Sequence, residues 1–180
     1  MDHRLNLIAQ APRLLVALDF DGVLSAIAPR PELARPVPGA LEALQALARL
    51  SQTDAAVVSG RSLDSLRSLV GRLERVHFVG SHGAEIVIDD RWSGAHEVSP
   101  ALETIVAEAS SIAPESDGFV LERKPTGIAV HYRNVEPKCA HDAITRLRAM
   151  ATGLGSIRLR EGKCVLELST SDADKGQAIK

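Results

Sequence analysis

Cysteine and aromatic residues are scarce in this chain of 180 residues, and neither sign of charge dominates. The two cysteines, Cys139 and Cys164, are too few for a disulfide framework and lack metal-ligand spacing, so we expect a reducing compartment, the cytoplasm. A formal net charge of -2 means that the chain has no overall excess of positive charge with which to bind nucleic acid or an anionic membrane. No apolar run is long enough to span a bilayer, and the first residues lack the apolar region of a signal peptide. The 45% hydrophobic content instead indicates a globular chain with one core or two small ones.

The first half of the chain alternates short apolar runs with amphipathic segments. Its predicted strands cover residues 14–19, 54–59 and 76–80, and its predicted helices cover residues 39–50 and 63–70. The first run is continuously apolar, which is typical of a parallel strand buried on both faces, and Ser62 is a predicted helix N-cap. This order predicts an α/β fold in which a parallel sheet has helices on both faces and a binding site at the carboxyl ends of its strands. Asp19, Ser59 and His82 fall at such ends.

The second half has a different rhythm, in which a helix followed by a hairpin occurs twice. The predicted helices cover residues 101–113 and 137–150, and the predicted hairpins cover residues 118–133 and 156–169. This αββαββ order predicts a small α+β domain inserted into the first. We therefore expect residues 1–98 and 170–180 to form one domain and residues 99–169 to form the other.

Alternation along the two hairpins separates an apolar from a polar face, if Lys124 pairs with Gly127 and Arg160 pairs with Lys163. The apolar face then carries Phe119, Leu121, Ile128, Val130, Tyr132, Ile157, Leu159, Cys164, Leu166 and Leu168. The polar face carries Glu122, Lys124, His131, Arg133, Arg158, Arg160, Lys163 and Glu167. The apolar face requires cover by the two helices, whereas the polar face is either solvated surface or a lid over a site in the other domain.

The first predicted strand ends on two aspartates, Asp19 and Asp21. Alternate residues of a strand project to the same side, so the two carboxylates are expected to converge, and Gly22 lets the chain turn away at once. Two carboxylates in one small space repel each other unless a proton or a divalent cation lies between them, and an oxygen-rich site suits Mg²⁺. A carboxylate can also act as a nucleophile and form an aspartyl-phosphate. The alternative is an exposed acidic turn.

Three later segments carry further candidates. The SGR stretch, residues 59–61, offers a hydroxyl and backbone N–H groups to an anion where a strand gives way to a helix, although an ordinary N-cap turn has the same pattern. The GSHGAE stretch places His82 between two glycines, which is also compatible with a plain turn. The DKGQAI stretch supplies Lys175, which either binds phosphate or lies at the surface.

These segments, taken in order, resemble a known family. DFDGVL, SGR, GSHGAE, ERKPTGIAVHYR, GKCVLEL and DKGQA are similar to trehalose-6-phosphate phosphatases, within the haloacid dehalogenase superfamily of aspartate-nucleophile phosphatases, from about Leu14 to the last residue. DFDGVL, SGR and the lysine are shared with many phosphatases of the superfamily. The E-x-K hairpin that ends in HYR and the later GK-x-V-x-E are more specific to the trehalose branch. Val23 replaces the usual threonine.

The resemblance implies a haloacid-dehalogenase-like Rossmannoid core with an inserted cap, and Mg²⁺-dependent hydrolysis of trehalose 6-phosphate in trehalose biosynthesis. It implies that Asp19 is the nucleophile and a Mg²⁺ ligand, and that Asp21 is the general acid and base, with its backbone carbonyl also on the metal. The implied phosphate-binding residues are Ser59, Gly60 and Lys175. The implied substrate-binding residues are Arg61, His82, Glu122, Lys124 and Glu167. The implied partner is a small sugar phosphate.

One part of the family pattern is absent. A later acidic cluster that completes the Mg²⁺ shell should follow DKGQA, but the sequence ends at Lys180, and we assign Asp172 and Asp174 to the connection back into the core. The sequence therefore allows either a truncated enzyme or a non-catalytic module that binds a sugar phosphate. Sucrose-phosphate and mannosyl-phosphoglycerate phosphatases are further alternatives. A nucleotide-binding Rossmann domain is disfavoured, because no G-x-G-x-x-G follows the first strand.

Overall fold

The computed structural model describes residues 3–89, 91–92 and 99–180, and the chain forms two compact units. The first unit comprises residues 1–95 and 173–180, and the second comprises residues 96–172. Residue 98, at which the sequence places the first domain boundary, lies outside the described residues. No helix in the described part of the chain combines the length and apolar character needed to cross a membrane.

The first unit is built on a five-stranded sheet with the order β1-β2-β3-β4-β5. Its strands are β1 (Leu14–Leu18), β2 (Thr53–Val58), β3 (Val76–Gly80), β4 (Glu85–Ile88) and β5 (Arg91–Trp92). The first three are parallel, as predicted, whereas β4 and β5 are antiparallel and were not predicted. Only the short turn η2 (Ser81–Gly83) connects β3 to β4, and two neighbouring strands joined without a crossover must run in opposite directions.

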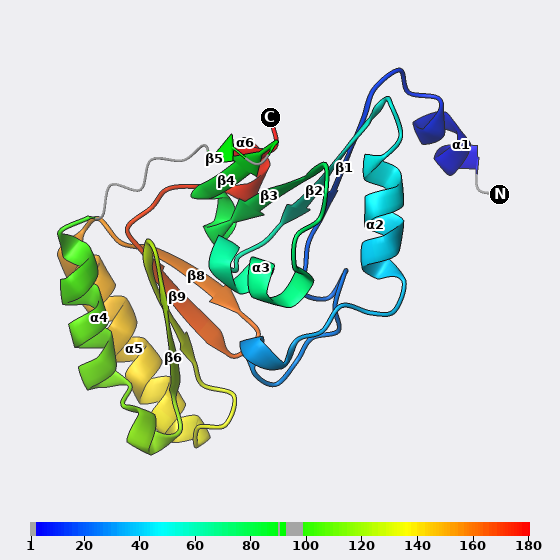
Figure 1. The fold of residues 1–180 in the computed structure, drawn as a ribbon. Coiled ribbons are helices and arrows are strands. Elements are labelled where there is room, and N and C mark those ends of the chain that lie inside the picture. Colours follow the sequence, from blue (N-terminus) through cyan, green and yellow to red (C-terminus); the bar gives the residue numbers. More distant parts are fainter. Residues whose placement is uncertain (1–2, 90, 93–98) are drawn as a thin grey trace. The chain divides into compact units, whose positions relative to one another are not determined.

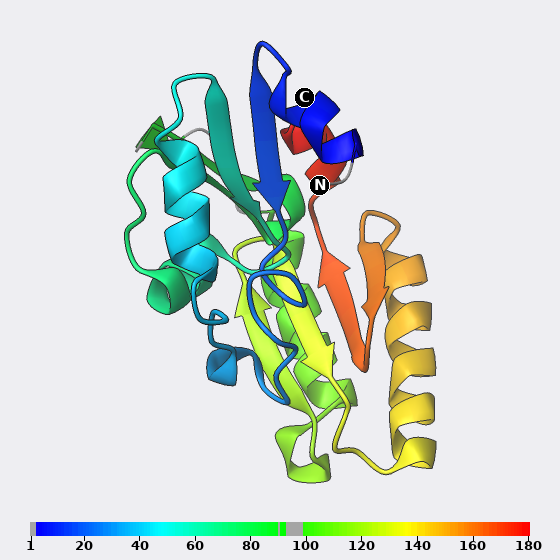
Figure 2. The same cartoon turned by 90° about the vertical axis from the view of Figure 1, so that its right-hand side faces the viewer.

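Two helices cover one face of this sheet. The helical elements of the unit are α1 (His3–Ala9), η1 (Pro31–Leu33), α2 (Ala40–Ala48), α3 (Leu63–Val70) and α6 (Lys175–Ala178). Leu44 of α2 and Leu66 of α3 share a core with Val57 of β2, and Figure 2 shows α2 alongside β1 and β2. Ala178 of α6 packs on the opposite face. The prediction that the first strand is buried on both faces is wrong, because Leu15 of β1 is 45% exposed and its neighbours in the strand are only partly buried.

The second unit is a four-stranded antiparallel sheet with two helices on one face (Figure 1). Its elements are α4 (Ala101–Ile112), η3 (Glu115–Asp117), β6 (Val120–Lys124), β7 (Gly127–His131), α5 (Pro137–Leu154), β8 (Arg158–Gly162) and β9 (Val165–Ser169). The strand order is β6-β7-β9-β8, so the second strands of the two hairpins lie side by side in the centre. Ile105 and Leu147 of the helices pack on Val130 and Leu166 of the central strands, which confirms the predicted cover of the apolar face.

The register of the first hairpin is confirmed and that of the second is wrong. Lys124 pairs with Gly127 as predicted, but Arg160 pairs with Glu167 and not with Lys163. The turn lies at residues 163–164, where Cys164 adopts a left-handed φ of 61°, so Lys163 and Cys164 leave their predicted faces. A Cβ atom on Gly162 would lie 2.7 Å from Val165 Cγ1, so the glycine serves strand pairing rather than the turn. The turn thus lies two residues later in the chain than predicted. Because side chains alternate with a period of two, this shift leaves the other side chains of the hairpin on their predicted faces.

Candidate active site

The carboxylate of Asp19 lies directly after β1 and contacts a lysine from the far end of the chain. Lys175 Nζ donates to Asp19 Oδ2 at 2.8 Å, while Asp19 Oδ1 accepts from the backbone N–H of Phe20 at 2.8 Å. Lys175 is the first residue of α6, which begins there because the Asp174 carboxylate accepts from the N–H groups of Gly176 and Gln177. The side chains of Asp19 and Lys175 are 42% and 32% exposed, so the pair is accessible to a ligand from solvent.

The second aspartate, Asp21, is held by Arg61. Arg61 Nε donates to Asp21 Oδ2 at 2.7 Å and Nη2 donates to Asp21 Oδ1 at 2.8 Å, which is the fork geometry of a strong arginine–carboxylate pair. Phe20, between the two aspartates, is fully buried, and its ring centroid lies 5.2 Å below the guanidinium carbon of Arg61. Each aspartate is therefore paired with a cation of the chain.

The loop after β2 is tied to the turn after β3 by backbone hydrogen bonds. The N–H of His82 donates to the Ser59 carbonyl at 3.0 Å, and the N–H of Ser81 donates to the Arg61 carbonyl at 2.7 Å. The hydroxyl oxygen of Ser59 accepts from the N–H of Arg61 at 3.1 Å, and Ser59 itself is buried. The SGR loop and the GSHG turn therefore form one connected structure at the carboxyl edge of the sheet.

Gly60 and His82 lie in direct contact within this structure. A Cβ atom on Gly60 would lie 2.6 Å from both Cε1 and Nε2 of His82, so only glycine allows the ring this position. His82 and Ser81 both have left-handed backbone conformations, with φ values of 56° and 46°. Gly80 is equally constrained, because its Cβ atom would lie 2.9 Å from the Leu63 backbone nitrogen.

Glu85 is a site residue that sequence analysis missed. It is 5% exposed, and its Oε2 atom accepts hydrogen bonds from the Ser81 hydroxyl and, at 3.2 Å, from the Leu63 N–H at the start of α3. A buried carboxylate needs such donors, and here they connect the turn after β3 to the helix that follows the SGR loop. The glutamate of GSHGAE was the available signal, because an acidic residue opens an otherwise apolar strand.

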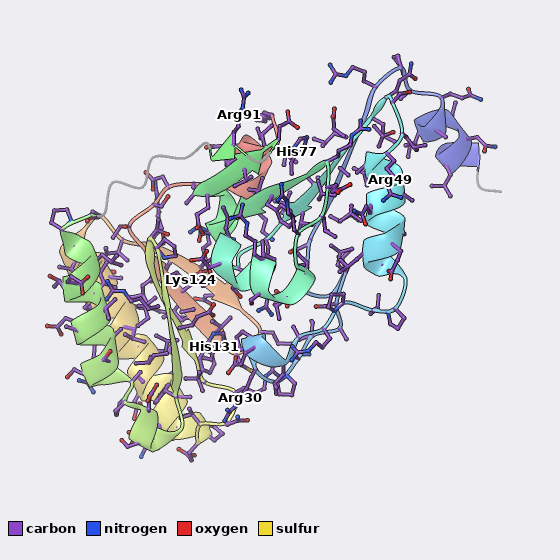
Figure 3. The ribbon with its side chains drawn as sticks, in the orientation of Figure 1. Arg30, Arg49, His77, Arg91, Lys124 and His131 are labelled. Carbon is purple, nitrogen blue, oxygen red and sulfur yellow. The ribbon has the colours of Figure 1, made fainter. Side chains whose placement is uncertain are left out.

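The second unit carries the other predicted binding residues on the face of its sheet opposite α4 and α5. Glu122 faces Ala129, Ala129 faces Glu167 and Glu167 faces Arg160, which places one row of side chains across all four strands. Lys124 forms an ion pair with Glu167, and their side chains are only 10% and 11% exposed. His131 Nε2 lies 3.0 Å from Glu122 Oε2 (Figure 3 labels Lys124 and His131). Sequence analysis placed His131 on this face but gave it no role.

The two acidic residues near the end of the chain have structural partners. Asp174 caps α6, and Asp172 forms an ion pair with Arg158. The hydrogen bond from Arg158, followed by its charge, lowers the pKa of Asp172 below its ordinary value. Among the residues described here, no group of three or more His, Cys, Asp or Glu side chains could hold a metal ion. Asp19 and Asp21 provide oxygen atoms of the kind that Mg²⁺ prefers, but only as part of a complete shell.

Comparison with known proteins places these residues in a family. The family model described as trehalose-phosphatase matches residues 17–180. A trehalose-phosphate phosphatase of Mycobacterium marinum is 35% identical over 177 residues, which cover 94% of this chain and 44% of that protein. A Mycobacterium tuberculosis protein named as an uncharacterized glycosyl hydrolase is 39% identical over 189 residues, which cover 97% of this chain and 14% of its own length.

Among solved structures, the C-terminal domain of trehalose-6-phosphate phosphatase from C. albicans superimposes with a TM-score of 0.86 at 21% identity. The match covers 97% of this chain and 63% of that one, and it confirms the predicted α/β fold, in which an α+β segment is inserted into a parallel-sheet core. This chain spans less than half the length of the mycobacterial relatives. Because the family model covers all but the first residues, the chain belongs to the trehalose-phosphatase family.

Proposed function

We propose that the protein carrying this chain hydrolyses trehalose 6-phosphate to trehalose and inorganic phosphate. The observation that carries the proposal is the family match over residues 17–180, a range that includes every candidate residue described above. Because the chain covers only part of its relatives, the activity is proposed for the whole protein. The cytoplasmic location expected from cysteine usage belongs to this proposal.

Asp19 is the proposed nucleophile. One of its carboxylate oxygens forms a bond to phosphorus while the bond from phosphorus to the sugar oxygen breaks, and Asp21 gives its proton to that oxygen. Asp21 then takes a proton from a water molecule, whose oxygen bonds to phosphorus as the bond to Asp19 breaks. One water is consumed, trehalose and phosphate leave, and both aspartates return to their initial protonation states.

Positive charge and N–H groups close to Asp19 support this assignment. Lys175 Nζ is 2.8 Å from Asp19 Oδ2, so an ammonium group lies beside the atom that would attack phosphorus. Phosphoryl transfer depends mainly on positioning and charge neutralisation, which Lys175, the Ser59 hydroxyl and the Gly60 backbone are proposed to supply. Both halves of the reaction then use groups from the carboxyl edge of one sheet.

Mg²⁺ is the proposed cofactor. Its proposed ligands in this chain are the Asp19 carboxylate and the backbone carbonyl of Asp21, both oxygen donors of the type that suits this ion. When bound, the ion would neutralise charge on the phosphoryl group. The half-exposed position of the Asp19 carboxylate leaves it accessible for this role.

The sheet face of the second unit opposite α4 and α5 is the proposed sugar-binding surface. Glu122, Lys124 and Glu167 present charged donors and acceptors on one face of a rigid antiparallel sheet, and disaccharide hydroxyls require directional contacts of this kind. The ion pair between Lys124 and Glu167 fixes the position of both groups before any ligand arrives, which lowers the entropic cost of binding.

Turnover by the full-length protein tests the proposal. Phosphate release from trehalose 6-phosphate in the presence of Mg²⁺ should disappear in Asp19→Asn and persist in Asp64→Asn, a control at an exposed position of α3. Sucrose 6-phosphate and mannosyl-phosphoglycerate, assayed in parallel, distinguish the related phosphatases. If the wild type binds trehalose 6-phosphate in a calorimeter but releases no phosphate, the protein is a sugar-phosphate-binding module and the proposal is wrong.

A further inference from the structure

Arg61 directs its side chain inward, toward groups of its own unit. Nε and Nη2 donate to the two carboxylate oxygens of Asp21, and Nη1 donates to the Pro31 carbonyl at 2.9 Å. The guanidinium lies over the Phe20 ring, and Ser65 Oγ is 3.5 Å from Nη1. All three guanidinium nitrogens are therefore engaged.

Exposure separates the two members of the Asp21–Arg61 pair. The Arg61 side chain is 8% exposed, whereas that of Asp21 is 40% exposed. The arginine thus lies behind the carboxylate and the carboxylate faces outward. A residue that bound the phosphate or the sugar directly would need free donors on the exposed side, and the contacts of Arg61 leave its guanidinium poorly placed for that purpose.

We propose that Arg61 is a positioning residue that holds Asp21, rather than a substrate ligand as the family resemblance implied. This inference rests on the proposed function, in which Asp21 donates and accepts the proton. The fork from Arg61 fixes the plane of the carboxylate, because two parallel hydrogen bonds allow little rotation about the last torsion of the side chain. Each oxygen keeps a second lone-pair position for the transferred proton.

The anchor for this fork comes from residues far apart in sequence. The Pro31 carbonyl belongs to η1, and the stretch between Asp21 and η1 folds back on itself, with Gly22 N–H donating to the Ser25 carbonyl at 2.8 Å. The backbone of Arg61 is fixed by Ser59 and Ser81. Arg61 therefore connects the loops that follow β2 and β3 to the carboxylate of Asp21 and fixes their relative position.

Two substrates with different leaving groups test the role of Arg61 in the full-length protein. Trehalose 6-phosphate releases a sugar oxygen that needs a proton, whereas p-nitrophenyl phosphate releases a phenolate that does not. We compare the wild type, Arg61→Lys, and Arg67→Lys as a control at an exposed arginine of α3. Arg61→Lys keeps the positive charge and loses the fork; Arg61→Gln replaces it if the lysine variant does not fold by circular dichroism.

On trehalose 6-phosphate, Arg61→Lys is expected to lower kcat by between about 10-fold and 100-fold with KM nearly unchanged. On p-nitrophenyl phosphate it is expected to release close to one nitrophenolate per enzyme in a rapid burst and then turn over slowly. The first half of the reaction needs no acid with this substrate, but hydrolysis of the aspartyl-phosphate still waits for Asp21 as base. A large rise in KM with unchanged kcat and no burst would overturn the proposal and make Arg61 a substrate ligand.

A stability measurement separates this inference from the proposed activity. If the wild type shows no turnover, the proposed function fails, and unfolding of Asp21→Asn, Arg61→Lys and the double variant then decides whether Arg61 holds Asp21. If Arg61 holds Asp21, Asp21→Asn should lower Tm in the wild type but have little further effect on Tm in the Arg61→Lys variant. Additive shifts in Tm would show that the pair does not hold together in solution and would overturn the inference.

Discussion

Lys124 on β6 reaches across β7 to pair with Glu167 on β9. The residues of β7 on this face next to the pair are Gly127, which has no side chain, and Ala129, which has only a methyl group, while His131 lies further along the strand beside Glu122. Strands lie about 4.8 Å apart, so a flexible lysine side chain can cover the two intervals only where nothing larger stands between. Small residues in the central strand thus make the ion pair possible.

Glu167→Gln is expected to lower the free energy of unfolding by about 1–2 kcal/mol, because Lys124 loses the charge of this partner in a mostly buried setting. Urea denaturation measures the change. Glu161→Gln is the matched control, since Glu161 pairs with Arg148 at 2.6 Å with both side chains about half exposed, and it should cost less than about 1 kcal/mol. Equal losses in the two variants would contradict the prediction.

Replacing both members of the buried pair gives a different outcome from replacing one. Lys124→Met combined with Glu167→Leu should return the free energy of unfolding to within about 1 kcal/mol of the wild type, since neither member of the pair then remains without the other. Affinity for trehalose 6-phosphate, measured by calorimetry, should still fall at least tenfold if these groups bind the sugar. A stable double variant with unchanged affinity would remove this face from the proposed binding site.

Gly127→Ala should destabilise the second unit by about 3 kcal/mol, because the new Cβ atom would lie 1.9 Å from the Leu168 carbonyl oxygen on the neighbouring strand. Thermal unfolding measures the loss. Gly153→Ala is the control: no atom lies within 4 Å of its Cβ position in α5, and alanine should stabilise the helix by about 0.5–1 kcal/mol. The prediction is wrong if the two alanine variants shift Tm in the same direction.

Glu85→Ala should cost about 2–4 kcal/mol, since it leaves the buried Ser81 hydroxyl and the Leu63 N–H without this acceptor. Glu85→Gln should cost less, because an amide oxygen can still accept. Denaturant titration of both variants gives the comparison. If glutamine is as damaging as alanine, the charge of Glu85 matters more than its hydrogen bonds.

The ion pair between Arg158 and Asp172 predicts a pH-dependent stability. Arg158 lowers the pKa of Asp172 in the folded chain below the unfolded value of about 3.9, so the pair contributes stability above that pH. The contribution is lost as the pH falls through the folded pKa. The free energy of unfolding of wild type and Asp172→Asn should therefore differ slightly at neutral pH and converge as the pH falls below the unfolded pKa of about 3.9. Both side chains are exposed, so added salt should also reduce the difference, and a difference independent of pH would contradict the assignment.

Local patterns predicted most of the elements, because periodicity and turn residues act over short distances. Pro125 and Thr126 mark the first hairpin turn, and the Lys124–Gly127 register follows from them. The second hairpin was misaligned because Gly162 resembles a turn residue, although it stands opposite Val165 to leave room for that side chain. The short strand β4 was not predicted, because a three-residue turn connects it to β3 and no amphipathic helix separates the two strands in the sequence.

Sequence patterns could not predict which residues far apart in the chain contact each other. Nothing in the pattern indicates that Arg61 turns inward to Asp21, 40 positions earlier, or that the guanidinium rests on Phe20. The motifs were sufficient to select the residues, because chemistry-bearing side chains follow each strand of a parallel sheet. Which atoms meet depends on rotamers and burial, which the spacing of residues along the chain does not encode.

The division of the first unit into residues 1–95 and 173–180 has a consequence for assembly. On a ribosome, Asp19 emerges early, but Lys175 and the α6 turn that packs near Gly83 follow only after the whole second unit has been synthesised. The second unit is continuous in the chain and can fold as soon as its last strand is complete. The inserted unit is therefore expected to form before Lys175 reaches Asp19, so the first unit cannot complete this contact until a segment made after the inserted unit has emerged.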